Sequence, residues 1–104
     1  MTVITVFRSR LQPGTEPTYE TLSAEISHLA RSMPGFLEEK TFISSDGERV
    51  TLVLFSDATS HAAWRDHPRH REAQDIGKQS LYSEYQIYSA EIDYAISFSH
   101  DAVS

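Results

Sequence analysis

The segment Arg49 to Phe55, with the sequence RVTLVLF, is apolar on both faces of any extended strand it forms. Successive side chains of a strand point to opposite faces of the sheet. Leu52 and Leu54 therefore lie on one face, and Val53 and Phe55 lie on the other. A layer of helices covers only one of these faces. The segment thus predicts a sheet whose second face is buried by something other than the helices.

Hydrophobic periodicity and turn signals give the order strand, helix, strand, strand, helix pair, strand. This βαββαβ order predicts an α+β, ferredoxin-like fold, in which a four-stranded antiparallel sheet carries the helices on one face. Strands are expected at Val3 to Leu11, Phe36 to Ser44, Arg49 to Phe55 and Leu81 to Tyr94, and helices at 15–33, 58–65 and 70–78.

Length and composition restrict the class of protein. A chain of 104 residues fits one domain, expected at 1–94, followed by a short C-terminal tail at 95–104. The net charge of −6 argues against nucleic acid as a partner. No apolar run reaches the roughly 18 residues of a membrane span. Without a basic, signal-like N-terminus or any cysteine, the chain is expected in the cytoplasm.

The second apolar face of the sheet predicts a partner. A large exposed apolar patch is rare in monomers. Each large side chain that a second copy buries contributes roughly 1.5–3 kcal/mol. We therefore expect a homodimer whose two sheets stack face to face. The alternative is a monomer in which the tail at 95–104 folds over the open face.

Several features together resemble the antibiotic biosynthesis monooxygenase family. They are the element order, the apolar strand at 49–55, the helix carrying Trp64, the run His67-Pro68-x-His70, and the tyrosine-rich last strand. The resemblance implies a dimeric α+β barrel with a pocket between helices and sheet. It also implies oxidation of polycyclic phenols or anthrones to quinones by O₂, without metal or flavin. Related branches degrade haem, and others isomerise or bind small metabolites.

The resemblance also points to site residues. In the quinone-forming branch an Asn lies one turn before the Trp and a Tyr two turns after it. Here Ser60 and His70 stand at those positions around Trp64. The haem-degrading branch has an Asn near the end of the first strand, where this chain has Phe7 or Arg8. Haem degradation is therefore the less favoured of the two activities.

Three residues are candidates for catalysis. Trp64 either forms the wall of an aromatic pocket or is a core anchor. His70 either acts as a general base or is a core histidine bonded to a backbone carbonyl. Arg8 either stabilises a developing anion or forms an ion pair with an acid.

Five further residues are candidates for substrate binding, namely Ser60, His67, Tyr82, Tyr85 and Phe7. Strict alternation would place Tyr82 and Tyr85 on opposite faces of the last strand. A metal site at the histidines is not expected, because Pro68 interrupts the His67-to-His70 spacing on a helix. No cofactor is expected.

These observations favour a small dimeric monooxygenase that oxidises a flat aromatic or enolisable molecule with O₂. Two alternatives remain open. One is a non-catalytic dimer that binds a small metabolite. The other is an isomerase or lyase, which would need a second acid or base, with Glu84 and Asp66 as the candidates.

Overall fold

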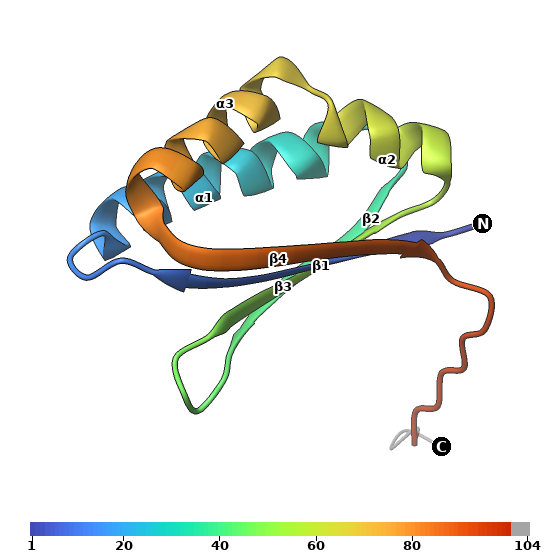
Figure 1. Cartoon of the computed structure of the whole chain (residues 1–104). Helices are drawn as coiled ribbons and strands as arrows, with labels where there is room; N and C mark the ends of the chain where they lie inside the picture. Colours follow the sequence, from blue (N-terminus) through green and yellow to red (C-terminus); the bar gives the residue numbers. More distant parts are fainter. Residues whose placement is uncertain (101–104) are drawn as a thin grey trace.

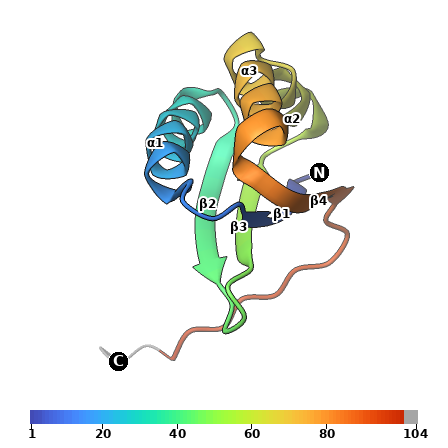
Figure 2. The ribbon, with the colours of Figure 1, turned by 60° about the vertical axis from the view of Figure 1, so that its left-hand side comes forward.

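The structure of the protein is a computed structural model that describes residues 1–100. A four-stranded antiparallel sheet, in the order β2-β3-β1-β4, carries all the helices on one face (Figures 1 and 2). The α+β, ferredoxin-like prediction is confirmed. The elements are β1 (Val3–Leu11), α1 (Glu16–Ser32), β2 (Phe36–Ile43), β3 (Arg49–Phe55), α2 (Ala58–Arg65), α3 (Pro68–Ile76), the π-helical turn η1 (Gly77–Leu81) and β4 (Tyr82–Glu91).

The core lies between the sheet and the helices. Phe55 and Ala30 are fully buried, and Val53 and Trp64 pack with them. The central strand β1 pairs with both β3 and β4 and directs Thr5, like its other odd-numbered residues, toward the helices. One face of the sheet is therefore covered by helices, as the strand pattern predicts.

The last strand differs from the prediction in two ways. It spans Tyr82–Glu91, not 81–94: its start is set by the π-helical turn η1, which occupies the five residues before it, and its pairing with β1 ends where Glu91 lies opposite Val3. The register against β1 also shifts between Arg10 and Leu11. This bulge adds one residue to β4, so that Tyr82 and Tyr85 lie on the same face, with ring centroids 5.7 Å apart. The prediction that these two tyrosines face opposite sides is wrong.

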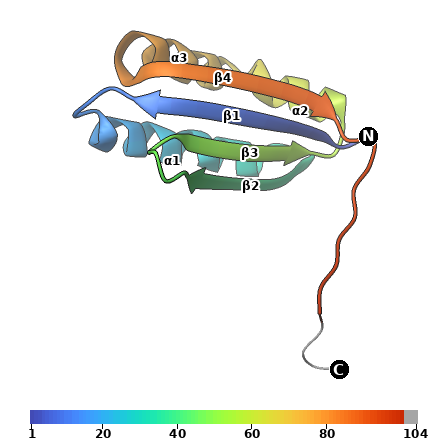
Figure 3. The ribbon, with the colours of Figure 1, turned by 60° about the horizontal axis from the view of Figure 1, so that its bottom comes forward.

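The second face of the sheet is bare in the subunit (Figure 3). Ile4, Leu52 and Leu54 on this face are only partly buried. The tail runs away from the body in extended form (Figures 1 and 3), with Tyr94 75 % and Phe98 86 % exposed. Up to residue 100 the tail therefore does not cover the open face; the remainder of the predicted tail, 101–104, lies outside the described residues.

Candidate active site

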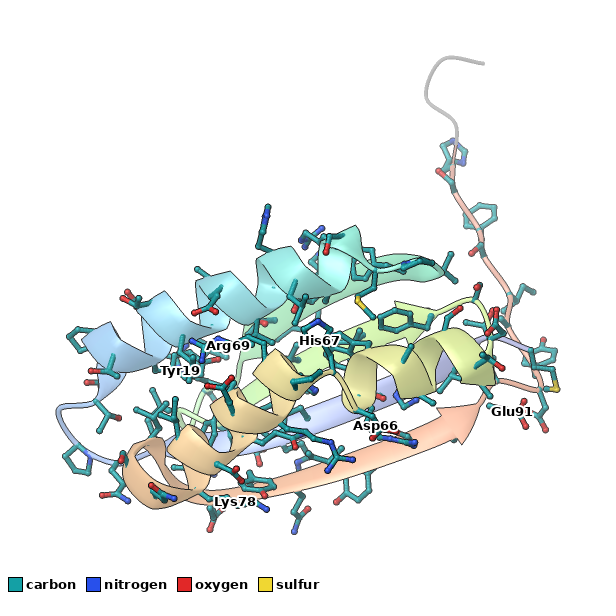
Figure 4. All side chains as sticks on the ribbon, turned by 90° about the horizontal axis from the view of Figure 1, so that it is seen from above. Tyr19, Asp66, His67, Arg69, Lys78 and Glu91 are labelled. Carbon is teal, nitrogen blue, oxygen red and sulfur yellow. The ribbon has the colours of Figure 1, made fainter. Side chains whose placement is uncertain are left out.

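A cavity of about 250 Å³ lies between the sheet and the helices. Strands β1, β3 and β4 form its floor, α1, α2 and α3 form its walls, and β2 contributes Glu39. Figure 4 looks down on this side of the molecule, with the helices in front of the sheet. The lining is largely aromatic and aliphatic with a few polar groups, which is typical of a small-molecule site. Five of the predicted site residues contribute to it: Trp64, His70, Phe7, Tyr82 and Tyr85.

His70 and Trp64 are stacked in the cavity wall. Their ring centroids lie 4.3 Å apart, with 25° between the planes. His70 Nδ1 lies 3.2 Å from the Arg65 carbonyl oxygen. A carbonyl only accepts, so Nδ1 donates this bond and Nε2 of the neutral ring keeps its lone pair. Burial lowers the pKa of His70 below its usual 6.5, against the smaller opposite effect of the Arg65 carbonyl. His70 is therefore neutral at pH 7 and able to accept a proton.

Trp64 serves both as a core anchor and as part of the cavity wall. Its indole is 6 % exposed and stacks on Phe55, with 5.3 Å between centroids. The indole also stacks on the His70 ring. Within residues 1–100 the buried Nε1–H has no hydrogen-bond acceptor. The ring thus fixes the position of the imidazole by contact on its face.

A second aromatic cluster lines the cavity further along β1. Phe7 contacts Tyr82 and Tyr85, with centroid distances of 5.4 and 5.6 Å, and Tyr19 contacts Tyr82 at 6.2 Å. Burial raises the pKa of Tyr82, so its hydroxyl stays protonated and available as a donor. Gly77 allows the close approach of this ring, because a Cβ at position 77 would overlap the Tyr82 ring.

The cavity also contains a polar cluster that was not predicted from the sequence. His61 on α2 is 5 % exposed, and its Nε2 lies 2.6 Å from Thr5 Oγ1, which in turn lies 2.7 Å from Ser89 Oγ. A signal was present, because His61 precedes Trp64 by three residues and therefore shares its helical face. Thr5 and Ser89 gave no such signal, since their contact depends on the pairing of β1 with β4.

Three of the predicted site residues lie outside the cavity. Arg8 points to the opposite face of the sheet, because side chains alternate along β1, and its Nε lies 3.1 Å from Glu48 Oε2. Ser60 packs against Gly35, since His61 and Trp64 occupy the cavity side of α2.

His67, the third of these residues, lies at the junction of α2 and α3 (Figure 4). There its Nδ1 accepts the Arg69 N–H at 3.1 Å and caps α3. His67 therefore caps α3 and does not line the cavity.

The two acidic residues expected as candidates for a second acid or base lie elsewhere than in the cavity. Glu84 lies 3.4 Å from Arg10 on the outer face, and Asp66 pairs with Arg65 and Arg71. Neither lines the cavity. Glu39 on β2 does line it, where it accepts a hydrogen bond from Ser27.

The described residues show neither a metal-binding cluster nor a membrane-spanning helix. In residues 1–100, no set of three or more His, Asp or Glu side chains is placed to hold a metal ion. None of the helices in that part of the chain has the length and hydrophobicity needed to cross a membrane.

Comparison with known proteins gives consistent matches. Residues 2–76 match the family model for antibiotic biosynthesis monooxygenase. The uncharacterised protein YqjZ of Bacillus subtilis is 28 % identical over 90 residues, which cover 85 % of this chain and 77 % of YqjZ. The jasmonate monooxygenase ABM of Pyricularia oryzae is 26 % identical over 84 residues, or 79 % of this chain, but the match spans only 39 % of that longer protein.

Solved structures share the fold at low sequence identity. SnoaB, a cofactor-independent oxygenase from Streptomyces nogalater, superposes with a TM-score of 0.77 at 13 % identity, covering 91 % of this chain and 96 % of SnoaB. Rv0793 from Mycobacterium tuberculosis gives a TM-score of 0.79 at 17 % identity, covering 92 % and 100 %.

Proposed function

The chain belongs to the antibiotic biosynthesis monooxygenase family, and we propose that it is a cofactor-independent monooxygenase acting on a flat aromatic or enolisable small molecule. The observation that carries the proposal is the pairing of Trp64 and His70. A flat apolar surface and a neutral imidazole with a free lone pair lie together in one largely apolar cavity. This is the combination that removal of a proton from an aromatic carbon acid requires.

The proposed reaction begins when His70 Nε2 takes a proton from an activated CH₂ group of the substrate. The carbanion that remains is delocalised over the ring system and transfers one electron to O₂, which gives a substrate radical and superoxide. Their combination forms a carbon–oxygen bond, and the proton held by His70 converts the resulting peroxide anion into a hydroperoxide. Loss of water from the hydroperoxide breaks the O–O bond and leaves a carbonyl. The balance is CH₂ + O₂ → C=O + H₂O, with one oxygen atom in the product and one in water.

The low polarity of the cavity lining supports this chemistry. The apolar lining disfavours a localised charge and favours a delocalised anion. Arg8 does not reach the cavity, so a guanidinium from β1 is not part of the proposal. Tyr82 and Tyr85 would donate hydrogen bonds to a developing oxyanion, and their presence in the cavity lining supports this role.

We further propose that the protein functions as a homodimer. The face of the sheet opposite the helices exposes part of Ile4, Leu52 and Leu54, together with Phe42 and Tyr88, which are 48 % and 51 % exposed. A face-to-face contact between two such sheets would bury these side chains. SnoaB, an oxygenase, shares the fold that presents this face.

The activity is tested with anthrone as a model carbon acid, incubated with the protein in air and under nitrogen. We expect conversion to anthraquinone in air only, with one O₂ consumed for each quinone formed. Equal absence of conversion above the background in both atmospheres would contradict a monooxygenase with this type of substrate. Heat-denatured protein is the control for spontaneous oxidation.

Glu39 supports an isomerase as a second candidate function, because its carboxylate lines the same cavity as His70. A proton-transfer enzyme needs a second acid or base, and Glu39 is held by Ser27 at the cavity wall. Exchange of substrate C–H hydrogens with D₂O under nitrogen, in the absence of oxidation in air, would favour this second function.

A further inference from the structure

One end of the cavity carries a connected set of polar groups. Thr5 from β1, His61 from α2 and Ser89 from β4 all line this end, and Thr5 lies within hydrogen-bond distance of both others, at 2.6 and 2.7 Å. Thr5 and His61 are 6 % and 5 % exposed. We propose that these three side chains form a hydrogen-bonding subsite for a neutral oxygen substituent, a hydroxyl or carbonyl, of the ligand. The inference rests on the proposed function for the aromatic class of that ligand.

The count of protons explains why the subsite suits a hydroxyl or carbonyl. The single Thr5 hydroxyl proton can satisfy only one of its two neighbours. If Thr5 donates to His61, it accepts from Ser89, and His61 keeps an N–H on Nδ1. If His61 donates to Thr5 instead, Thr5 donates to Ser89, which then has its own proton to give. In either arrangement one N–H or O–H proton of the set has no acceptor among the three side chains, and a ligand oxygen would supply that acceptor.

The charges around the subsite favour a neutral ligand group. Burial lowers the pKa of His61, and the nearby Arg65 guanidinium lowers it further, so the imidazole is uncharged at pH 7. The Arg65 guanidinium is itself neutralised by Asp66, with Nε 3.1 Å from Oδ1. A carboxylate or phosphate would therefore be desolvated here without a free cation.

The position of the subsite relative to His70 defines the ligand more closely. The Trp64 indole contacts both imidazoles, with centroid distances of 6.0 Å to His61 and 4.3 Å to His70. A flat ligand in this cavity can thus meet His70 with one part of its rim and the subsite with another. We therefore infer a substrate that carries an oxygen substituent remote from the reacting carbon; in a phenol without an acidic C–H, a second hydroxyl can take the place of that carbon at His70.

The test compares phenols of one size that differ in the number of hydroxyl groups. Binding of 2-naphthol, 2,6-dihydroxynaphthalene and 2,7-dihydroxynaphthalene is measured by calorimetry under nitrogen. We expect at least one diol to bind the natural protein about 3- to 10-fold more tightly than 2-naphthol, the effect of one neutral hydrogen bond. In Thr5→Val and Ser89→Ala the preference for the diol should disappear.

Two variants serve as controls. Thr5→Ser keeps the hydroxyl and should retain the preference. Ser83→Ala removes a hydroxyl from the same strand as Ser89, but one that lies outside the cavity and bonds the Arg10 carbonyl, and it should also retain the preference. A preference that survives both Thr5→Val and Ser89→Ala, equal affinities for all three phenols, or no binding of any phenol would overturn the proposal. Because the measurement needs no O₂, failure of the oxygenase activity leaves it interpretable.

Discussion

At the residue scale, the site depends on how one imidazole is held. The Arg65 carbonyl is near the end of α2, where backbone carbonyls lack helical partners, and it accepts the His70 Nδ1–H. Trp64 then supports the ring from its face. These two contacts fix both the tautomer and the orientation of His70, so that Nε2 is the atom available for proton transfer.

We expect His70→Ala to lower kcat for anthrone oxidation by about 10²–10⁴-fold, the usual contribution of a general base. His28→Ala, which removes an exposed histidine from α1, is the matched control and should keep full activity. Circular dichroism checks that both variants are folded. If His70→Ala kept the kcat of the natural protein, His70 would not be the base.

The pH profile of kcat/KM tests the same role. The base works in its neutral form, and burial lowers its pKa below 6.5. Activity should therefore rise with pH, pass through a single midpoint below 6.5, and stay level above it. A midpoint above 6.5, or activity that falls as pH rises from 5 to 7, would disagree with a half-buried, neutral histidine as the base.

Gly77 controls the place of Tyr82 in the cavity. A Cβ at this position overlaps the tyrosine ring, so we expect Gly77→Ala to cost about 1–3 kcal/mol of unfolding free energy through overpacking. In a Tyr82→Ala background the same substitution should cost clearly less, because the obstructing ring is gone. Urea denaturation of the four proteins measures this coupling, and equal costs in both backgrounds would show that Gly77 has another role.

At the element scale, α2 supplies the groups on which the site is built. His61, Trp64 and Arg65 lie on its cavity side. The helix begins after Asp57, whose side chain accepts the Ser60 N–H at 2.8 Å, as expected of an N-cap residue. The direction of this short helix, and with it the position of the indole, depends on how its first turn is anchored.

We predict that Asp57→Ala lowers the free energy of unfolding by about 1 kcal/mol, the typical value of a lost N-cap. Asp57→Asn keeps an acceptor at the same place and should retain most of the stability. Chemical denaturation of both variants gives the comparison. If alanine and asparagine prove equally stable, the cap does not hold α2.

At the scale of the whole molecule, the bare face of the sheet is the feature that remains to be explained. The helices cover one face only, and the described part of the tail leaves the other open (Figure 3). Leu52 and Leu54 lie at the centre of the open face, on β3, which is an inner strand of the sheet. A charge placed there would be buried without a partner in any face-to-face dimer.

We therefore expect Leu52→Lys to convert a dimer into a monomer in sedimentation velocity at micromolar concentration. Thr18→Lys, which adds the same charge at an exposed position on α1, should leave the dimer intact. A natural protein that sediments as a single subunit would contradict the proposed dimer directly. A Leu52→Lys dimer would show that the subunits associate through another surface.

The sequence by itself determined the fold. The alternation in β1, the continuous apolar run of β3, the breaks at Pro34-Gly35 and Asp46-Gly47, and the stripe of α1 are local patterns, and the βαββαβ order follows from them. It also marked Trp64 and His70, because a lone indole and a nearby imidazole stand out on the helices after an apolar strand.

Only the tertiary structure decided the composition of the cavity. A bulge adds one residue to β4 and places Tyr82 on the same face of the sheet as Tyr85. The periodicity of the sequence does not predict this bulge. The contact of Thr5 with Ser89 depends on the register of two strands far apart in sequence. Periodicity determines which face a side chain takes within its own element, whereas contacts between elements depend on register and packing, which the whole chain sets together.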